Sequence, residues 1–85
     1  MSDTESRVAS LPPSAKLVYK TLEYEGRLTQ SELATESRLP QRTVRHALRK
    51  LEDAGAVEEA VYLMDARKSM YMTAGDQESE AAAAL

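Results

Sequence analysis

The stretch LTQSELATESRLPQRTVRHALRKLEDAGAV, which runs from Leu28 to Val57, decides the fold of this 85-residue chain. Near its start, Thr29 and Glu32 have the T-x-x-E spacing of a capping box, in which each side chain accepts a hydrogen bond from a free backbone N–H. Pro40 disfavours helical backbone at the residue before it, so the first helix is expected to end near Arg38. The stretch therefore predicts a short helix, a turn of about three residues and a second helix.

The second helix is expected from Gln41 to Ala54, and its two sides differ in character. One side carries apolar residues at i, i+3, i+4 and i+7, the spacing of a buried helix face, namely Val44, Ala47, Leu48 and Leu51. Gly55 follows, and glycine readily adopts the left-handed conformation that ends many helices. This helix should therefore pack one side into a core and leave the other side in solvent.

The flanking segments continue the pattern in both directions. On the N-terminal side a helix is expected up to Gly26, followed by a brief strand over 27–29. On the C-terminal side, residues 57–63 and 69–73 are rich in β-branched and aromatic residues and predict a hairpin around the loop 64–68. The expected fold class is therefore α+β, mostly α.

The helix expected before Gly26 supplies part of the core and a candidate dimer contact. It should begin at about Ser14, whose hydroxyl can cap it. The residues expected to face the core are Leu17, Val18 and Leu22. Tyr19 falls outside this apolar stripe, so its ring is expected to be exposed, and a dimer contact through Tyr19 or Tyr24 is a hypothesis.

The two ends of the chain differ from its middle. Residues 1–10 are polar and aperiodic, and residues 74–85 are acidic and then alanine-rich, so both are expected to be mobile tails around a single domain over residues 11–73. The chain has no cysteine, no apolar run near the roughly 18 residues that span a bilayer, and no apolar N-terminal region for secretion. These features predict a cytoplasmic protein without a membrane partner.

The net charge of −3 conceals a basic segment. Residues 38–51 contain no acidic side chain and five basic ones, namely Arg38, Arg42, Arg45, Arg49 and Lys50. On a helical wheel, Arg42, Arg45 and Arg49 point away from the apolar side. A guanidinium group can bind a phosphate or, in bidentate fashion, the O6 and N7 edge of guanine. The segment is thus a candidate DNA-binding surface, and a merely solvated helix face is the alternative.

Other candidate contacts surround these arginines. Gln41 and Thr43 lie at the end of the helix that usually meets bases or phosphates in a major groove. His46 lies on the arginine side, either as a phosphate donor or as an ordinary exposed residue. Arg67 and Lys68 stand at the expected hairpin tip, where they either reach a flanking phosphate or minor groove or serve only solubility.

Enzymatic and metal-binding functions have no support in the sequence. His46 is the only histidine and lies on a basic helix, and no serine stands in a nucleophile-elbow sequence. One histidine without cysteine does not assemble a metal site. The three glycines are too far apart for a phosphate-cradling loop. We therefore expect no catalytic residue, no metal and no cofactor.

The stretch from Leu28 to Val57 resembles the winged helix-turn-helix of prokaryotic transcription regulators, particularly those of the MarR type and the archaeal TrmB type. The resemblance extends from Leu11 to about Thr73 and implies three helices with a three-stranded antiparallel sheet. It implies that residues 41–54 form the recognition helix and that Arg67 and Lys68 make wing contacts. Two features depart from the pattern. Pro40 replaces the usual Ser or Thr cap, and the chain has no room for the additional dimerisation and effector-binding helices of MarR-type proteins.

Together these observations predict a sequence-specific transcription regulator that binds double-stranded DNA. The recognition helix would enter the major groove and the wing would contact the flanking backbone. A homodimer on two half-sites about one helical turn apart is expected, since one small half-site rarely gives useful specificity. The alternative is a winged-helix protein–protein interaction module of the transcription machinery, which an exposed apolar patch on the recognition helix would favour.

Overall fold

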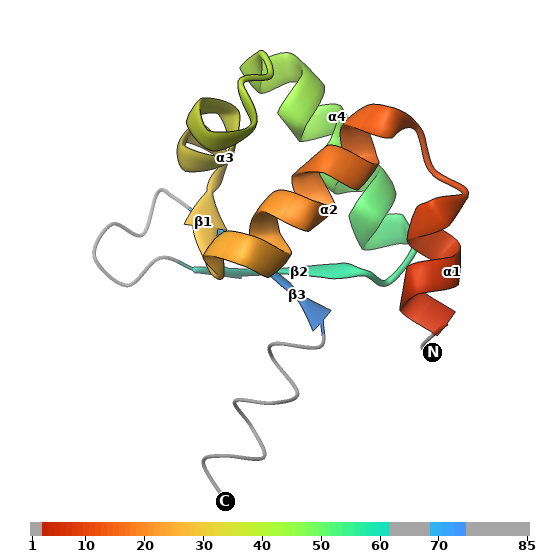
Figure 1. Ribbon diagram of the computed structural model, residues 1–85. Coiled ribbons are helices and arrows are strands. Elements are labelled where there is room, and N and C mark those ends of the chain that lie inside the picture. The colour runs from red at the N-terminus through yellow and green to blue at the C-terminus, as the bar shows by residue number, and fades with distance from the viewer. Residues whose placement is uncertain (1–2, 62–68, 75–85) are drawn as a thin grey trace, which may run out of the picture.

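The computed structural model describes residues 3–61 and 69–74. Its elements follow the order helix, helix, strand, helix, helix, strand, strand (Figure 1): α1 (Asp3–Ala9), α2 (Pro13–Glu25), β1 (Leu28–Thr29), α3 (Gln30–Ser37), α4 (Gln41–Asp53), β2 (Val57–Val61) and β3 (Ser69–Thr73). The sheet has the order β1-β3-β2, and both pairings are antiparallel. The predicted α+β fold with a three-stranded antiparallel sheet is confirmed.

The helices meet in one aliphatic core beside the sheet. Leu22 of α2, Leu33 of α3 and Leu51 of α4 are fully buried, and Val57 extends the same cluster onto β2. Leu28 and Tyr71 pack against its edge from β1 and β3. Since the chain contains no Phe or Trp, branched aliphatic side chains provide most of the apolar burial that stabilises the domain.

The capping box at the start of α3 is present as predicted. The Thr29 hydroxyl accepts a hydrogen bond from the Glu32 N–H at 3.2 Å, and the Glu32 carboxylate accepts one from the Thr29 N–H at 2.8 Å. At the other end of α3, Arg38 has a left-handed φ of 63° and begins the turn. The local signals in the sequence therefore fix both ends of this helix.

Substituting Thr29 with Ala should destabilise the domain by about 1 kcal/mol, because it removes the cap from the N-terminus of α3. Thr21 provides a matched control in the middle of α2, where its hydroxyl donates to the Leu17 carbonyl at 2.8 Å. Thr21→Ala should change stability little, since Ala is the better helix former. Urea denaturation of both variants measures the difference. Equal losses would show that the cap contributes nothing beyond the loss of a threonine.

The helix α4 begins without a side-chain cap. Pro40 occupies the N-cap position, and its carbonyl accepts the first helical hydrogen bond from the Val44 N–H at 3.0 Å. At the C-terminal end Gly55 has a left-handed φ of 74°, as expected for a residue that ends a helix. Arg7 donates from Nη1 to the Ala54 carbonyl at 3.1 Å, which places a positive charge at the negative end of α4.

The expectation of a mobile tail over residues 1–10 is wrong for α1. Val8 is only 6% exposed and belongs to the core cluster, while Arg7 contacts the end of α4. A single large apolar residue, Val8, gives α1 no periodic signal, so this helix depends on tertiary contacts that the local sequence does not reveal.

Two expectations for α2 are also corrected. Tyr19 is 7% exposed, whereas Leu17 is 43% exposed. The face actually buried runs at i, i+3, i+4 and i+7 through Ala15, Val18, Tyr19 and Leu22, because α1 packs against α2 and completes the cover of this face. In addition, Ser14 does not cap the helix, since Pro12 is the N-cap and no side-chain cap bond forms.

Candidate nucleic-acid interface

The helices α3 and α4 form a helix-turn-helix unit joined by residues 38–40 (Figure 1). Their N-terminal ends are also joined by side chains, because Gln30 donates from Nε2 to the Gln41 Oε1 at 3.3 Å. Leu33 of α3 and Val44 of α4 are both fully buried in the shared core. The unit therefore holds α4 at a fixed place on the surface.

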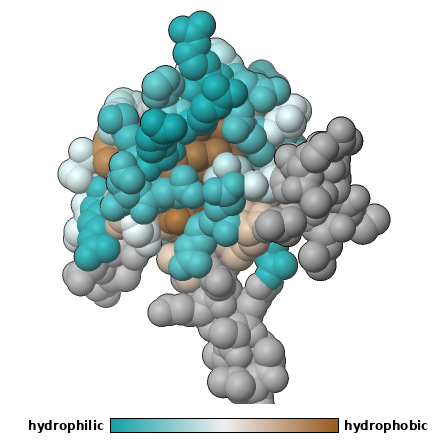
Figure 2. Space-filling model, turned by 180° about the vertical axis from the view of Figure 1, so that it is seen from behind, coloured by the Kyte–Doolittle hydropathy of each residue, from teal (hydrophilic) through white to brown (hydrophobic). Residues whose placement is uncertain are grey.

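The two sides of α4 separate as the sequence predicts. The buried side carries Val44, Ala47, Leu48 and Leu51. Arg42, Arg45 and Arg49 are exposed on the other side. In Figure 1, α2 passes in front of α4, so the reversed view of Figure 2 faces the α4 side, which is mostly hydrophilic around a small hydrophobic centre. The exposed residues of α4 are all polar or charged, so the apolar patch required for a protein-interaction helix is missing from it.

The arginines of α4 form no close ion pair within the described part of the chain. The salt bridge found there joins Lys20 to Glu23 on α2, at 3.4 Å. Arg42, Arg45 and Arg49 form neither an ion pair nor a hydrogen bond with another described side chain. Their guanidinium donors therefore face solvent, where they are available to an anionic ligand.

The other predicted DNA contacts differ in their exposure to solvent. Arg38 is exposed in the turn before α4, and His46 and Lys50 are exposed on α4 itself. Gln41 is exposed, but its carbonyl oxygen accepts the bond from Gln30. Thr43 is half-buried. The predicted wing contacts Arg67 and Lys68 lie outside the described residues, as does the loop 64–68 to which they belong.

Sequence reasoning missed an acidic neighbourhood beside the arginines. Burial raises the pKa of the Glu52 carboxyl, the negative charges of Glu59 and Asp53 raise it further, and Arg49 opposes them. The Glu59 of β2 is the cross-strand neighbour of Tyr71. Burial, Glu59 and Glu52 raise the pKa of the Tyr71 hydroxyl, while Arg45 lowers it. Sheet register brings Glu59 toward α4, and the sequence of residues 57–61, VEEAV, has no regular alternation that would show on which face Glu59 lies.

Neither a cluster of metal ligands nor a membrane-spanning helix is found in the described part of the molecule. Among residues 3–61 and 69–74, no three His, Asp or Glu side chains are grouped so that they could hold a metal ion. Within the same ranges, no helix has the length and hydropathy needed to cross a membrane.

The comparison with family models identifies the same region. The model described as "Winged helix-turn-helix DNA-binding" matches residues 13–58, more than half of the chain. This range contains α2, β1, α3 and α4. No curated protein sequence matches the chain.

Solved structures share the fold. AbfR in its reduced form, bound to DNA, is 26% identical, with a TM-score of 0.71 over 92% of this chain and 59% of that one. The MarR family transcription regulator SP03579 is 15% identical, with a TM-score of 0.74 over 91% and 52% of the two chains. A probable transcriptional regulator from Pseudomonas aeruginosa is 15% identical, with a TM-score of 0.75 over 89% and 64%. The chain thus spans about half to two thirds of the length of these proteins.

Proposed function

This chain belongs to the winged helix-turn-helix DNA-binding family, and we propose that it is a transcription regulator that binds double-stranded DNA in a sequence-specific manner. In this proposal α4 is the recognition helix and lies in the major groove. The protein acts by occupying its site and catalyses no reaction. The DNA-bound structure of AbfR, 26% identical over most of this chain, supports the choice of partner.

The observation that carries the proposal is the exposed, unpaired arginine side of α4. The buried side fixes the orientation of the helix, so Arg42, Arg45 and Arg49 extend outward together. Arginine binds phosphate or guanine through two parallel hydrogen bonds, which gives both affinity and a preference for particular bases. Phosphate contacts position the protein on the duplex, and base contacts supply its specificity.

The surrounding residues complete the proposed interface. Arg38, His46 and Lys50 contribute phosphate contacts at the borders of the arginine side. Gln41 and Thr43 contact bases or phosphates at the N-terminal end of α4. Gln41 can donate from its amide NH₂ while its oxygen accepts the hydrogen bond from Gln30. Arg67 and Lys68 of the wing are proposed to contact the flanking backbone.

A selection from random duplexes tests whether binding is sequence-specific. We expect repeated rounds of binding and amplification to enrich one short motif that contains guanines opposite the arginines. Sequencing of the bound pool without an enriched motif would contradict specific recognition. Failure to retain any duplex at low salt would instead favour the protein-interaction module of the transcription machinery.

A homodimer is the proposed assembly. A single recognition helix contacts only a few base pairs, so a second copy adds affinity through avidity and increases specificity. Such a contact would use α2, the wing or the terminal segments of the chain, since α4 binds DNA in this proposal.

Replacing Glu52 with Gln should strengthen DNA binding by about two- to fivefold, because a negative charge beside Arg49 repels the phosphates. The pKa of Glu52 lies above its usual value, so lowering the pH protonates Glu52 before an ordinary exposed carboxyl. Wild-type affinity should therefore rise as the pH falls toward this pKa, and Glu52→Gln should lack that component.

Fluorescence anisotropy of a labelled duplex over a pH series measures both effects. Glu36→Gln is the matched control, since it also removes one exposed carboxylate. Glu36 lies on α3 beside Tyr24 of α2, and not beside the arginines of α4. Identical pH profiles for wild type and Glu52→Gln would show that Glu52 does not act on the bound DNA.

A further inference from the structure

The exposed face of α2 carries large hydrophobic side chains in contact with solvent. Leu17 and Tyr24 are the large hydrophobic residues exposed in the described part of the chain, at 43% and 88%. They are seven residues apart, with Lys20 and Thr21 between them, so all four lie on one side of the helix. This side is opposite the face that carries Val18 and Leu22 into the core.

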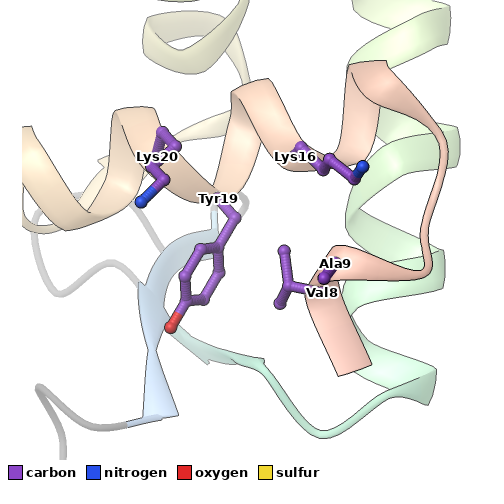
Figure 3. A pocket seen from close by; sticks show the side chains of 5 residues that line it. All are labelled: Val8, Ala9, Lys16, Tyr19 and Lys20. Atoms are coloured by element: carbon purple, nitrogen blue, oxygen red, sulfur yellow. The ribbon is translucent and has the colours of Figure 1, made fainter. Parts of the chain in front are cut away.

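A hollow lies beside this face, between α1 and α2 (Figure 3). Its volume is about 330 Å³, and its lining consists of Val8, Ala9, Lys16, Tyr19 and Lys20. In Figure 3, Val8 of α1 and the ring of Tyr19 face the hollow below Lys16 and Lys20 of α2. The hollow combines an apolar floor with the ammonium group of Lys16 and that of Lys20, which is paired with Glu23. This lining suits an aromatic ring, because the ring can pack on the floor while its face attracts a lysine.

The exposed face of α2 is complementary to itself. If two α2 helices cross antiparallel between Lys20 and Thr21, Leu17 of each copy lies opposite Tyr24 of the other. Lys16, Lys20 and Glu23 follow each other along one flank of the helix, at i, i+4 and i+7. A two-fold axis brings this flank of one copy against the same flank of the other, so each Glu23 lies between Lys16 and Lys20 of the other copy. This attraction offsets the repulsion between the two Lys20 side chains, which meet near the axis.

We propose that two copies of this chain pair through α2, with Tyr24 of each copy seated in the α1–α2 hollow of the other. The pairing rests on the proposed DNA binding for its role, but it places the two copies differently from a pair bound to adjacent half-sites of one duplex. Lys20 connects the two halves of the contact, since it belongs both to the exposed face and to the rim of the hollow. Tyr24 fits this role because it is a rigid aromatic group held at the end of a helix, the kind of residue that anchors interfaces.

The pairing places the DNA-binding surfaces on the outside. In each copy α2 and α4 bury one face in the same core, and α2 passes in front of α4 (Figure 1), so their exposed faces point to opposite sides. A dimer through α2 therefore directs its two arginine sides away from each other. Such a dimer binds two separate duplex segments and bridges them, in contrast to the expected pair of half-sites on one duplex.

Sedimentation equilibrium of the full chain without DNA tests the contact. We expect a concentration-dependent dimer whose dissociation constant rises about tenfold or more in Tyr24→Ser. Tyr24 is so exposed that this variant should keep the fold, which thermal denaturation verifies. Arg49→Ala is the control, and it should dimerise like wild type. A wild-type chain that stays monomeric, or a Tyr24→Ser chain that dimerises like wild type, overturns the proposal.

Charge reversal tests the flank of the contact. Lys20→Glu should weaken the dimer, because it places two acidic residues where Lys20 and Glu23 now alternate. Lys20→Glu combined with Glu23→Lys restores the alternation, so the double variant should recover dimerisation. Recovery supports the two-fold arrangement, whereas equal loss in the single and double variants contradicts it.

A capture experiment separates this inference from the proposed function. A labelled duplex should be retained on beads that carry a second duplex only when dimeric wild type is present. Tyr24→Ser should bind single duplexes normally but lose the capture, while Arg49→Ala should lose both. A wild type that dimerises and binds DNA without capturing a second duplex would refute the outward orientation. Loss of DNA binding with an intact dimer would instead refute the proposed function.

Discussion

Replacing Leu22 with Ala should destabilise the domain by about 3 kcal/mol, enough to leave a substantial fraction of the chain unfolded at 37 °C. Leu22 is fully buried at the centre of the cluster that joins α2 to the other helices. The substitution removes apolar contact area and leaves a cavity that the neighbouring side chains only partly fill. A chain of 85 residues has little stability in reserve, so this loss approaches the whole margin.

Leu17→Ala is the matched control on the same helix. Leu17 is 43% exposed and lies outside the core cluster, so its truncation should cost less than about 1 kcal/mol. Urea denaturation in dilute solution, where association does not contribute, compares the two variants. Equal losses would mean that Leu17 is as deeply buried as Leu22 and would contradict the orientation of α2.

Replacing Arg45 and Arg49 together with Ala should weaken duplex binding by about 100-fold or more at moderate salt. Both guanidinium groups are exposed and form no hydrogen bond or ion pair within the described residues, so their removal breaks no such contact and only ends the weak attraction of Arg49 to Glu52 and of Arg45 to Tyr71. Alanine is also a good helix former, and the variant should retain its thermal stability. The loss would therefore report directly on DNA contacts.

A charge-matched control separates specific contacts from the general effect of charge. Lys16→Ala combined with Lys20→Ala also removes two positive charges, but from the opposite side of the molecule. On a short duplex that accommodates a single copy, this control should bind about as tightly as wild type. A loss as large as that of the arginine variant would indicate that binding follows net charge alone.

The helix-turn-helix could be predicted from sequence because its signals are local. Thr29 and Glu32 begin α3, Pro40 separates the helices, and Gly55 ends α4 within two residues of the expected position. Each signal acts through the backbone of its own segment, so it needs no knowledge of distant contacts. The outward direction of the arginines followed from the regular repeat of apolar residues on α4.

The parts that escaped prediction depend on distant contacts. Val8 anchors α1 by packing into a core made of residues far away in the sequence, so α1 cannot be predicted from its own residues. Tyr19 and Leu17 exchanged their expected environments because α1 covers one side of α2. The acidic neighbourhood of Arg49 arises from the register that pairs Glu59 with Tyr71, which single-strand patterns do not specify.

A salt series on wild type and the Arg45→Ala/Arg49→Ala variant tests most directly whether the arginine side of α4 binds DNA. Anisotropy of a labelled duplex gives the dissociation constant at each salt concentration. Each phosphate contact contributes about 0.9 to the slope of log affinity against log salt. We predict that the variant binds more weakly and that its slope is shallower by up to about 2, according to how many of the two arginines contact phosphates. Equal affinities and equal slopes for the two proteins would contradict DNA binding by this side of α4.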